Sequence, residues 1–115
     1  MSGELATSGQ VDLAVLCSRD GASAVVVVWG GPVRCADTME SSLDEHWTQH
    51  IGGGIMGYSR AIAVSEPEGT FEYLSERGHD PPPLDHDVLS DAFLEKASTM
   101  YYCHAGEWLA LGGAD

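Results

Sequence analysis

Two histidines, His46 and His50, have the spacing in this sequence that most resembles a metal site. On a helix their rings would share one face, as zinc coordination requires. Trp47, Thr48 and Gln49 separate them, so the glutamate base of the H-E-x-x-H motif is absent. We therefore expect no cofactor, and keep a zinc-dependent hydrolase or metal-binding domain as an alternative. Its candidate ligands are His46, His50, His79 and His86, with Asp80, Asp85 and Asp87 able to orient a ring.

The three cysteines offer little chemistry of their own. Cys103 and His104 are neighbours on an expected strand, so their side chains point to opposite faces and cannot form a catalytic pair. Cys35 precedes an expected helix whose dipole would favour a thiolate, but no residue stands out as its base. None of the cysteines forms a C-x-x-C pair, and an odd number does not suggest a disulfide framework. We expect Cys17 and Cys103 to be buried thiols, and favour a protein without catalytic activity.

The charge balance is the most unusual feature of the sequence. Five basic and 18 acidic side chains give a formal net charge of −13 over 115 residues. Solubility of a small domain needs a magnitude of only about 2–8. Lys and Arg are absent from residues 36–59 and from residues 80–95, although both stretches are rich in acids. Such a balance disfavours direct contact with a nucleic-acid backbone and suggests electrostatic steering of a basic partner.

We therefore expect a small acidic binding or inhibitor protein, of the immunity-protein, antitoxin or phage-inhibitor type. It would occlude a basic, nucleic-acid-handling protein such as a nuclease, a deaminase or a toxin, with carboxylates in the places that phosphates occupy. The expected partner-binding residues are Asp37, Glu40, Asp44, Glu45, Tyr58, Asp85, Asp87, Asp91 and Glu95. A further alternative is a structural or assembly subunit whose acidity is incidental.

The hydrophobic pattern predicts two helices. In residues 37–51, Asp37 and Glu40 resemble a capping box, and an apolar stripe that includes Met39 and Leu43 recurs at helical spacing. In residues 87–97, Val88, Leu89, Ala92 and Phe93 would form the buried face of the second helix.

Three hairpins are expected around these helices. They pair residues 11–17 with 24–29, residues 60–65 with 70–75, and residues 99–104 with 108–111. The four consecutive valines of residues 25–28 favour a strand buried on both faces. A helix over residues 70–77, capped by Gly78, competes with the strand over residues 70–75.

The expected fold class is α+β, in the order ββ-α-ββ-α-ββ: a mostly antiparallel sheet of hairpins with two helices packed on one face. Residues 1–10 would be a flexible N-terminal lead-in and residues 11–115 a single domain. The lead-in lacks the basic and apolar regions of a signal peptide, and no apolar run is long enough to cross a bilayer. We expect no membrane association and a cytoplasmic location.

Overall fold

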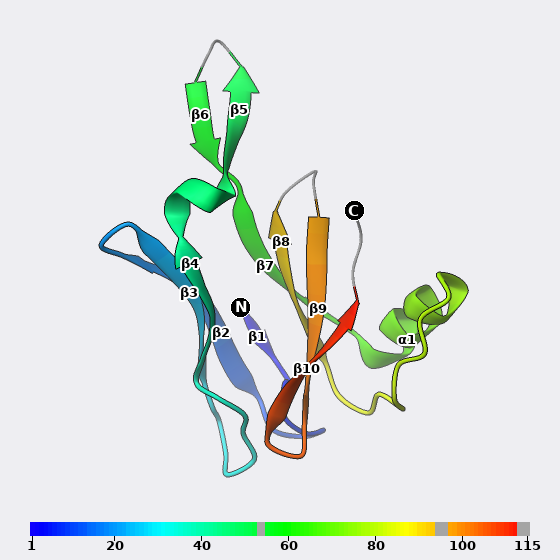
Figure 1. The fold of residues 1–115 in the computed structure, drawn as a ribbon. Helices are drawn as coiled ribbons and strands as arrows, with labels where there is room; N and C mark the ends of the chain where they lie inside the picture. The colour runs from blue at the N-terminus through cyan, green and yellow to red at the C-terminus, as the bar shows by residue number, and fades with distance from the viewer. Residues whose placement is uncertain (53–54, 94–96, 113–115) are drawn as a thin grey trace.

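A computed structural model of the protein describes residues 1–52, 55–93 and 97–112, without the side chains of Glu40, Glu45, Trp47 and residues 49–58. Over these residues the chain forms two four-stranded antiparallel sheets, a separate two-stranded hairpin and one α-helix (Figure 1). No helix in the described part of the chain is long and apolar enough to span a membrane.

The first sheet, which we call the N-terminal sheet, has the strand order β1-β2-β3-β4. Its strands are β1 (Ser2–Gly3), β2 (Asp12–Arg19), β3 (Ala22–Val28) and β4 (Thr38–Leu43). Asp20 and Gly21 join β2 to β3 with φ angles of 53° and 78°. Two positive φ angles are typical of the type I′ turn that Asp-Gly favours, so the predicted first hairpin is confirmed.

The second sheet, the C-terminal sheet, has the strand order β10-β9-β8-β7. Its strands are β7 (Arg60–Ser65), β8 (Val88–Phe93), β9 (Ala97–His104) and β10 (Glu107–Gly112). The predicted hairpin around Ala105 and Gly106 is confirmed, with φ angles of 51° and 84° at these two residues.

One segment connects the two sheets, and another connects β7 to β8 within the C-terminal sheet. The 3-10 helix η1 (Asp44–Trp47) leads from β4 into the hairpin of β5 (Thr48–Gly52) and β6 (Ile55–Tyr58), which projects from one end of the molecule (Figure 1). The helix α1 (Pro67–Glu76) follows β7. A connector, residues 77–87, then leads into β8.

The two sheets pack face to face. Ala14, Val25 and Val27 from the N-terminal sheet meet Leu89 from the C-terminal sheet in one buried cluster, with Trp29 and Trp108 at its border. A second cluster lies on the other side of the C-terminal sheet, where Leu74 of α1 packs against Val88, Tyr102 and Leu111. The result is three layers: the N-terminal sheet, the C-terminal sheet, and α1 with its connector (Figure 1).

A disulfide joins the two sheets, because Cys35 precedes β4 and Cys103 lies on β9. Their Cα atoms are 5.9 Å apart, and 68 positions separate them in the sequence. The expectation of buried thiols is therefore wrong at both positions, because Cys103 is in a disulfide and Cys17 is exposed. Cys17 is the free cysteine, and it is exposed. The odd count is explained by one pair and one free thiol.

The predicted α+β architecture, with two helices packed on a sheet, is wrong: the described chain has one α-helix and two antiparallel sheets. The helix expected over residues 37–51 is instead β4, η1 and β5. β4 supplies the hydrogen-bonding partner that the edge of β3 requires, and Met39 then points into the core opposite Val25. Thr38, Ser41 and Ser42 are weak helix formers, so local propensity did not oppose this pairing.

The helix expected over residues 87–97 is also wrong. β8 occupies Val88–Phe93, and β9 begins at Ala97. Val88 and Leu89 point to opposite faces of the C-terminal sheet, and both are completely buried. A strand that is covered on both faces loses the alternation of apolar and polar residues, which is why it resembled a helix.

Two smaller expectations also need correction. Residues 70–75 belong to α1 and not to a strand, and Gly78, with a φ of 83°, ends the segment as the competing helix required. The first ten residues are not a flexible lead-in, because β1 pairs with β2 and Leu5 is completely buried. The Asp12 carboxylate accepts a hydrogen bond from the Leu5 N–H at 3.1 Å and anchors this segment.

Candidate functional site

The expected partner-binding residues of the first acidic stretch lie along β4 and η1. Asp37 is exposed just before β4, and its Oδ1 accepts a hydrogen bond from Trp29 Nε1 at 2.9 Å. Asp44 opens η1, and its Oδ2 accepts a hydrogen bond from Ser18 Oγ at 2.6 Å. Glu40 lies on β4 and Glu45 on η1, but their side chains are outside the described part of the structure. The first stretch thus borders one edge of the N-terminal sheet.

The second acidic stretch has a structural role at two of its positions. Asp91 is only 5% exposed and forms a two-pronged ion pair with Arg60, at 2.9 Å and 2.6 Å. Arg60 Nη1 also donates to the Ser23 carbonyl of the other sheet at 2.9 Å. Asp87 Oδ2 accepts from the Glu4 N–H at 2.9 Å and ties down the N-terminus. Asp91 is therefore inaccessible to a partner, whereas Asp87 is half-buried with one carboxylate oxygen engaged in the fold.

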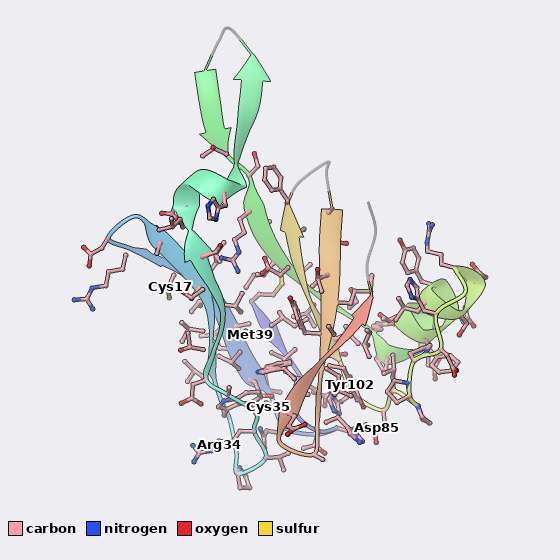
Figure 2. All side chains as sticks on the ribbon, in the orientation of Figure 1. Cys17, Arg34, Cys35, Met39, Asp85 and Tyr102 are labelled. Atoms are coloured by element: carbon pink, nitrogen blue, oxygen red, sulfur yellow. A yellow bond between two sulfur atoms is a disulfide. The ribbon has the colours of Figure 1, made fainter. Side chains whose placement is uncertain are left out.

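Asp85 remains exposed, but it too is engaged with the fold. Its carboxylate accepts a hydrogen bond from Tyr102 Oη at 2.7 Å, and the His86 ring stacks on the Tyr102 ring at 4.1 Å. Figure 2 shows Asp85 and Tyr102 on the side of the C-terminal sheet that faces α1. Burial raises the pKa of the Tyr102 hydroxyl above its ordinary value, and the hydrogen bond from the Asp85 backbone partly opposes this shift. Tyr102 is thus a core residue.

The side chains of two further candidates lie outside the described part of the structure. Glu95 lies in residues 94–96, outside the described part of the chain, and Tyr58 ends β6 with its side chain likewise outside it.

The structure does not place His46 and His50 on one face, as a helix would. His46 lies on η1 and is exposed, whereas His50 lies on β5, so the shared helical face on which the metal hypothesis depended is absent. His79 follows α1, and His86 is buried against Tyr102. Within the residues that the structure describes, no three His, Cys, Asp or Glu side chains are grouped as a metal site. The helix whose spacing motivated the zinc alternative is therefore not formed by residues 46–50.

Sequence reasoning missed an acidic surface that lies on α1. Glu68, Glu72 and Glu76 are four residues apart and form a row along the exposed side of the helix. Thr70 and Leu74 occupy the opposite side, which packs on the C-terminal sheet. The repeated Glu-x-x-x-Glu spacing was visible in the sequence, but the competing strand over residues 70–75 concealed it.

The acidic surface extends beyond the helix at both ends. Its members, which we call the α1 acidic face, are Glu66, Glu68, Glu72, Glu76, Asp80 and Asp85, and all of them are exposed. Arg77 is the basic residue of this segment, and its guanidinium lies over the Tyr73 ring, 4.3 Å from the centroid.

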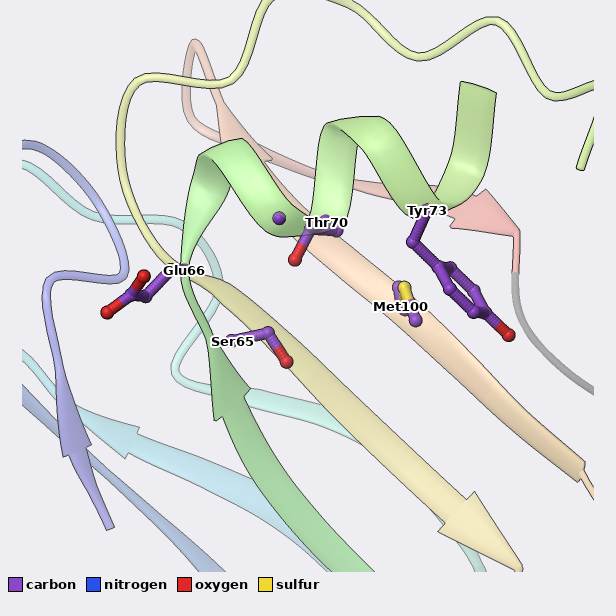
Figure 3. A pocket seen from close by; sticks show the side chains of 6 residues that line it. Ser65, Glu66, Thr70, Tyr73 and Met100 are labelled. Atoms are coloured by element: carbon purple, nitrogen blue, oxygen red, sulfur yellow. The ribbon is translucent and has the colours of Figure 1, made fainter. Parts of the chain in front are cut away.

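An open groove runs between the first turn of α1 and the C-terminal sheet (Figure 3). It encloses about 420 Å³ and is lined by Ser65, Glu66, Gly69, Thr70, Tyr73 and Met100. Its hydroxyl groups could bind a polar segment of a partner, while Glu66 disfavours an anion. The groove therefore adjoins the α1 acidic face.

Comparison with known proteins adds no evidence on function: no family model, curated protein or solved structure matches this chain.

Proposed function

We propose that this protein is a small acidic binding protein that occludes a basic, nucleic-acid-handling protein partner, such as a nuclease, a deaminase or a toxin. The observation that carries the proposal is the row of Glu68, Glu72 and Glu76 on the exposed side of α1. Like charges four residues apart destabilise a helix by about 0.2–0.5 kcal/mol per pair. A partner that neutralises the row would remove this repulsion, so the arrangement favours the bound state.

The mechanism follows from electrostatics. The α1 acidic face presents several carboxylates from a helix that is fixed by Leu74 in the core, so little order is lost on binding. Carboxylates held in this way would take the places of phosphates in the partner's basic cleft and exclude its nucleic-acid substrate. The net charge of −13 would accelerate encounter with a basic protein at low salt.

The acids of β4 and η1 form a second contact region in this proposal. Asp37 is exposed and accepts one hydrogen bond from the protein, which leaves carboxylate capacity for a partner. Asp44 is half-buried, and the carboxylate oxygen that does not bind Ser18 is itself buried, so Asp44 contributes its charge and not a free oxygen. With Glu40 and Glu45 they belong to a stretch of the sequence that has no Lys or Arg.

The test uses a panel of purified basic nucleases, deaminases and toxins, each assayed on its own nucleic-acid substrate. Inhibition and association rate are measured for the wild type and for Glu68→Lys/Glu72→Lys. The matched control is Glu107→Lys/Ser8→Lys/His104→Lys, which changes the net charge equally at exposed sites outside both acidic regions. Asp44→Lys/Glu45→Lys tests the second region.

We expect the α1 variant to slow association with an inhibited enzyme by about tenfold or more at low salt, and the control to have a much smaller effect. The effect should shrink as salt is raised. The proposal fails if neither acidic-region variant changes the association rate of any partner more than the control does.

A cytoplasmic location is also a proposal, and the disulfide weighs against it, because disulfides persist mainly in oxidising compartments. Trapping of thiols in intact cells, followed by non-reducing electrophoresis, measures whether Cys35 and Cys103 are oxidised where the protein is produced. Free thiols at both positions would favour the cytoplasm.

A further inference from the structure

The outer face of the N-terminal sheet is apolar and uncovered. Leu13 and Val28 are direct cross-strand neighbours on β2 and β3, and they are 44% and 59% exposed. The pairs next to them in register point to the same side of the sheet. We call this surface the bare face; its members are Leu13, Val15, Cys17, Ala24, Val26 and Val28.

None of the six side chains that define the bare face is charged, and in the described chain no element packs over it (Figure 1). Soluble monomers rarely expose a continuous apolar surface of this kind, and large ones usually mark an interaction site. The run of valines was expected to be buried on both faces; within one chain only one face is.

The charges at the two ends of the bare face are balanced in sign. At the β2–β3 turn, Arg19 Nε lies 3.7 Å from Asp20 Oδ2. At the other end, Arg34 and Asp37 both line a shallow depression of about 370 Å³ beside Val26 and Val28. Figure 2 shows Arg34 and Cys17 on the side of the molecule away from Asp85 and Tyr102. The α1 acidic face, which would repel another acidic chain, thus lies beyond the C-terminal sheet.

We propose that the bare face binds a second copy of this chain, in a two-fold dimer with the N-terminal sheets stacked face to face. Each end of the face carries one Arg and one Asp, so each end meets a charge of the opposite sign whether the strands of the two copies run parallel or antiparallel. In the dimer, a sheet of the second copy would pack on the outer face of the N-terminal sheet, just as the C-terminal sheet packs on its inner face. The six uncharged side chains of the bare face offer a strongly basic partner no charge to pair with.

The dimer leaves both α1 acidic faces exposed, on the outer sides of the assembly. The dimer does not depend on the proposed function, and the two kinds of association respond to salt in opposite ways. Screening weakens binding to a basic partner, whereas it strengthens association of two copies that each carry −13.

The test measures the mass of the full chain by sedimentation and light scattering across a wide range of concentrations, at low and high salt. Cys17→Ser is used throughout, so that no intermolecular disulfide can form while the Cys35–Cys103 bond stays intact. Val28→Lys is compared with Phe71→Lys, because Phe71 is a 39% exposed apolar residue on α1 and the charge change is identical.

We expect a dimer that tightens with salt. Val28→Lys should raise its dissociation constant about a hundredfold, because the lost burial is counted in both copies, while Phe71→Lys should leave it unchanged. Circular dichroism checks that each variant is folded. In a chain that retains Cys17, the rate of maleimide labelling should fall as the protein concentration rises, a readout that needs no substitution.

Two results would overturn the proposal. One is a chain that stays monomeric at every protein and salt concentration, with Cys17 labelled at a constant rate. The bare face would then bind a different protein and not a second copy. The other is equal weakening by Val28→Lys and Phe71→Lys, which would mean that the copies associate through another surface.

Discussion

The two sheets of this protein have similar inner faces and very different outer faces. The outer face of the C-terminal sheet is covered by α1 and its connector, and there Leu74, Val88 and Tyr102 are buried. The outer face of the N-terminal sheet, with Leu13 and Val28, is apolar and exposed. Apolar composition alone therefore does not show which face a chain covers by itself. The difference separates a face used for folding from one that is free to associate.

The largest change in the free energy of unfolding is expected from the disulfide that joins the two sheets. Replacing Cys35 and Cys103 by Ser should lower the free energy of unfolding by about 4 kcal/mol, because the disulfide closes a long loop and restricts the unfolded chain. Chemical denaturation of the variant and of the wild type measures this difference.

The control for that experiment is a thiol count in the denatured protein. We expect Cys17 alone to react before reduction, and all three cysteines to react after it. Three reactive thiols before reduction would contradict the disulfide, and the sheets would then be held only by their shared core.

The next effect contrasts the covered face with the bare one. Leu74→Ala should lower the free energy of unfolding by about 2–5 kcal/mol, because Leu74 is completely buried between α1 and the C-terminal sheet. Val28→Ala should change it by less than about 0.5 kcal/mol in dilute, monomeric protein, because Val28 is already 59% exposed. Denaturation curves measured at low concentration compare the two. Equal losses would mean that the bare face is covered.

Local signals in the sequence identified the hairpins but not the layers. Asp20-Gly21 and Ala105-Gly106 form tight turns whose geometry depends on a few adjacent residues, so both hairpins could be predicted. Whether a strand is covered on one face or two depends on distant segments. Val88-Leu89 therefore resembled a helix, and the valines of β3 resembled a strand buried on both faces.

The candidate site was predictable only where charge remained on the surface. Asp37 and Asp44 do lie at the edge of a sheet, but Asp91 neutralises Arg60 between the two sheets, which no local pattern indicates. With only five basic residues, each one can form an ion pair inside the fold. The sequence does not indicate which of the 18 acids pairs with which base. The α1 acidic face was missed because recognising it required the helix first.

The smallest effect concerns a single hydroxyl on the covered face. The pKa of Tyr102 is raised in the folded protein, mainly by burial, relative to the ordinary value of 10.0. Above about pH 10 the unfolded chain therefore releases a proton that the folded chain retains, and stability should fall as the pH rises. Below about pH 10 the stability that the neutral Tyr102 hydroxyl contributes is fully present.

Thermal unfolding measured at increasing alkaline pH should show this decline in stability in the wild type and a shallower decline in Tyr102→Phe. Tyr73→Phe, which leaves Tyr102 in place, is the matched control and should keep the wild-type slope. If the stability of both variants falls equally with pH, the alkaline loss of stability arises from another group. The Tyr102 hydroxyl would then be less shielded from water by α1 and its connector than a covered outer face implies.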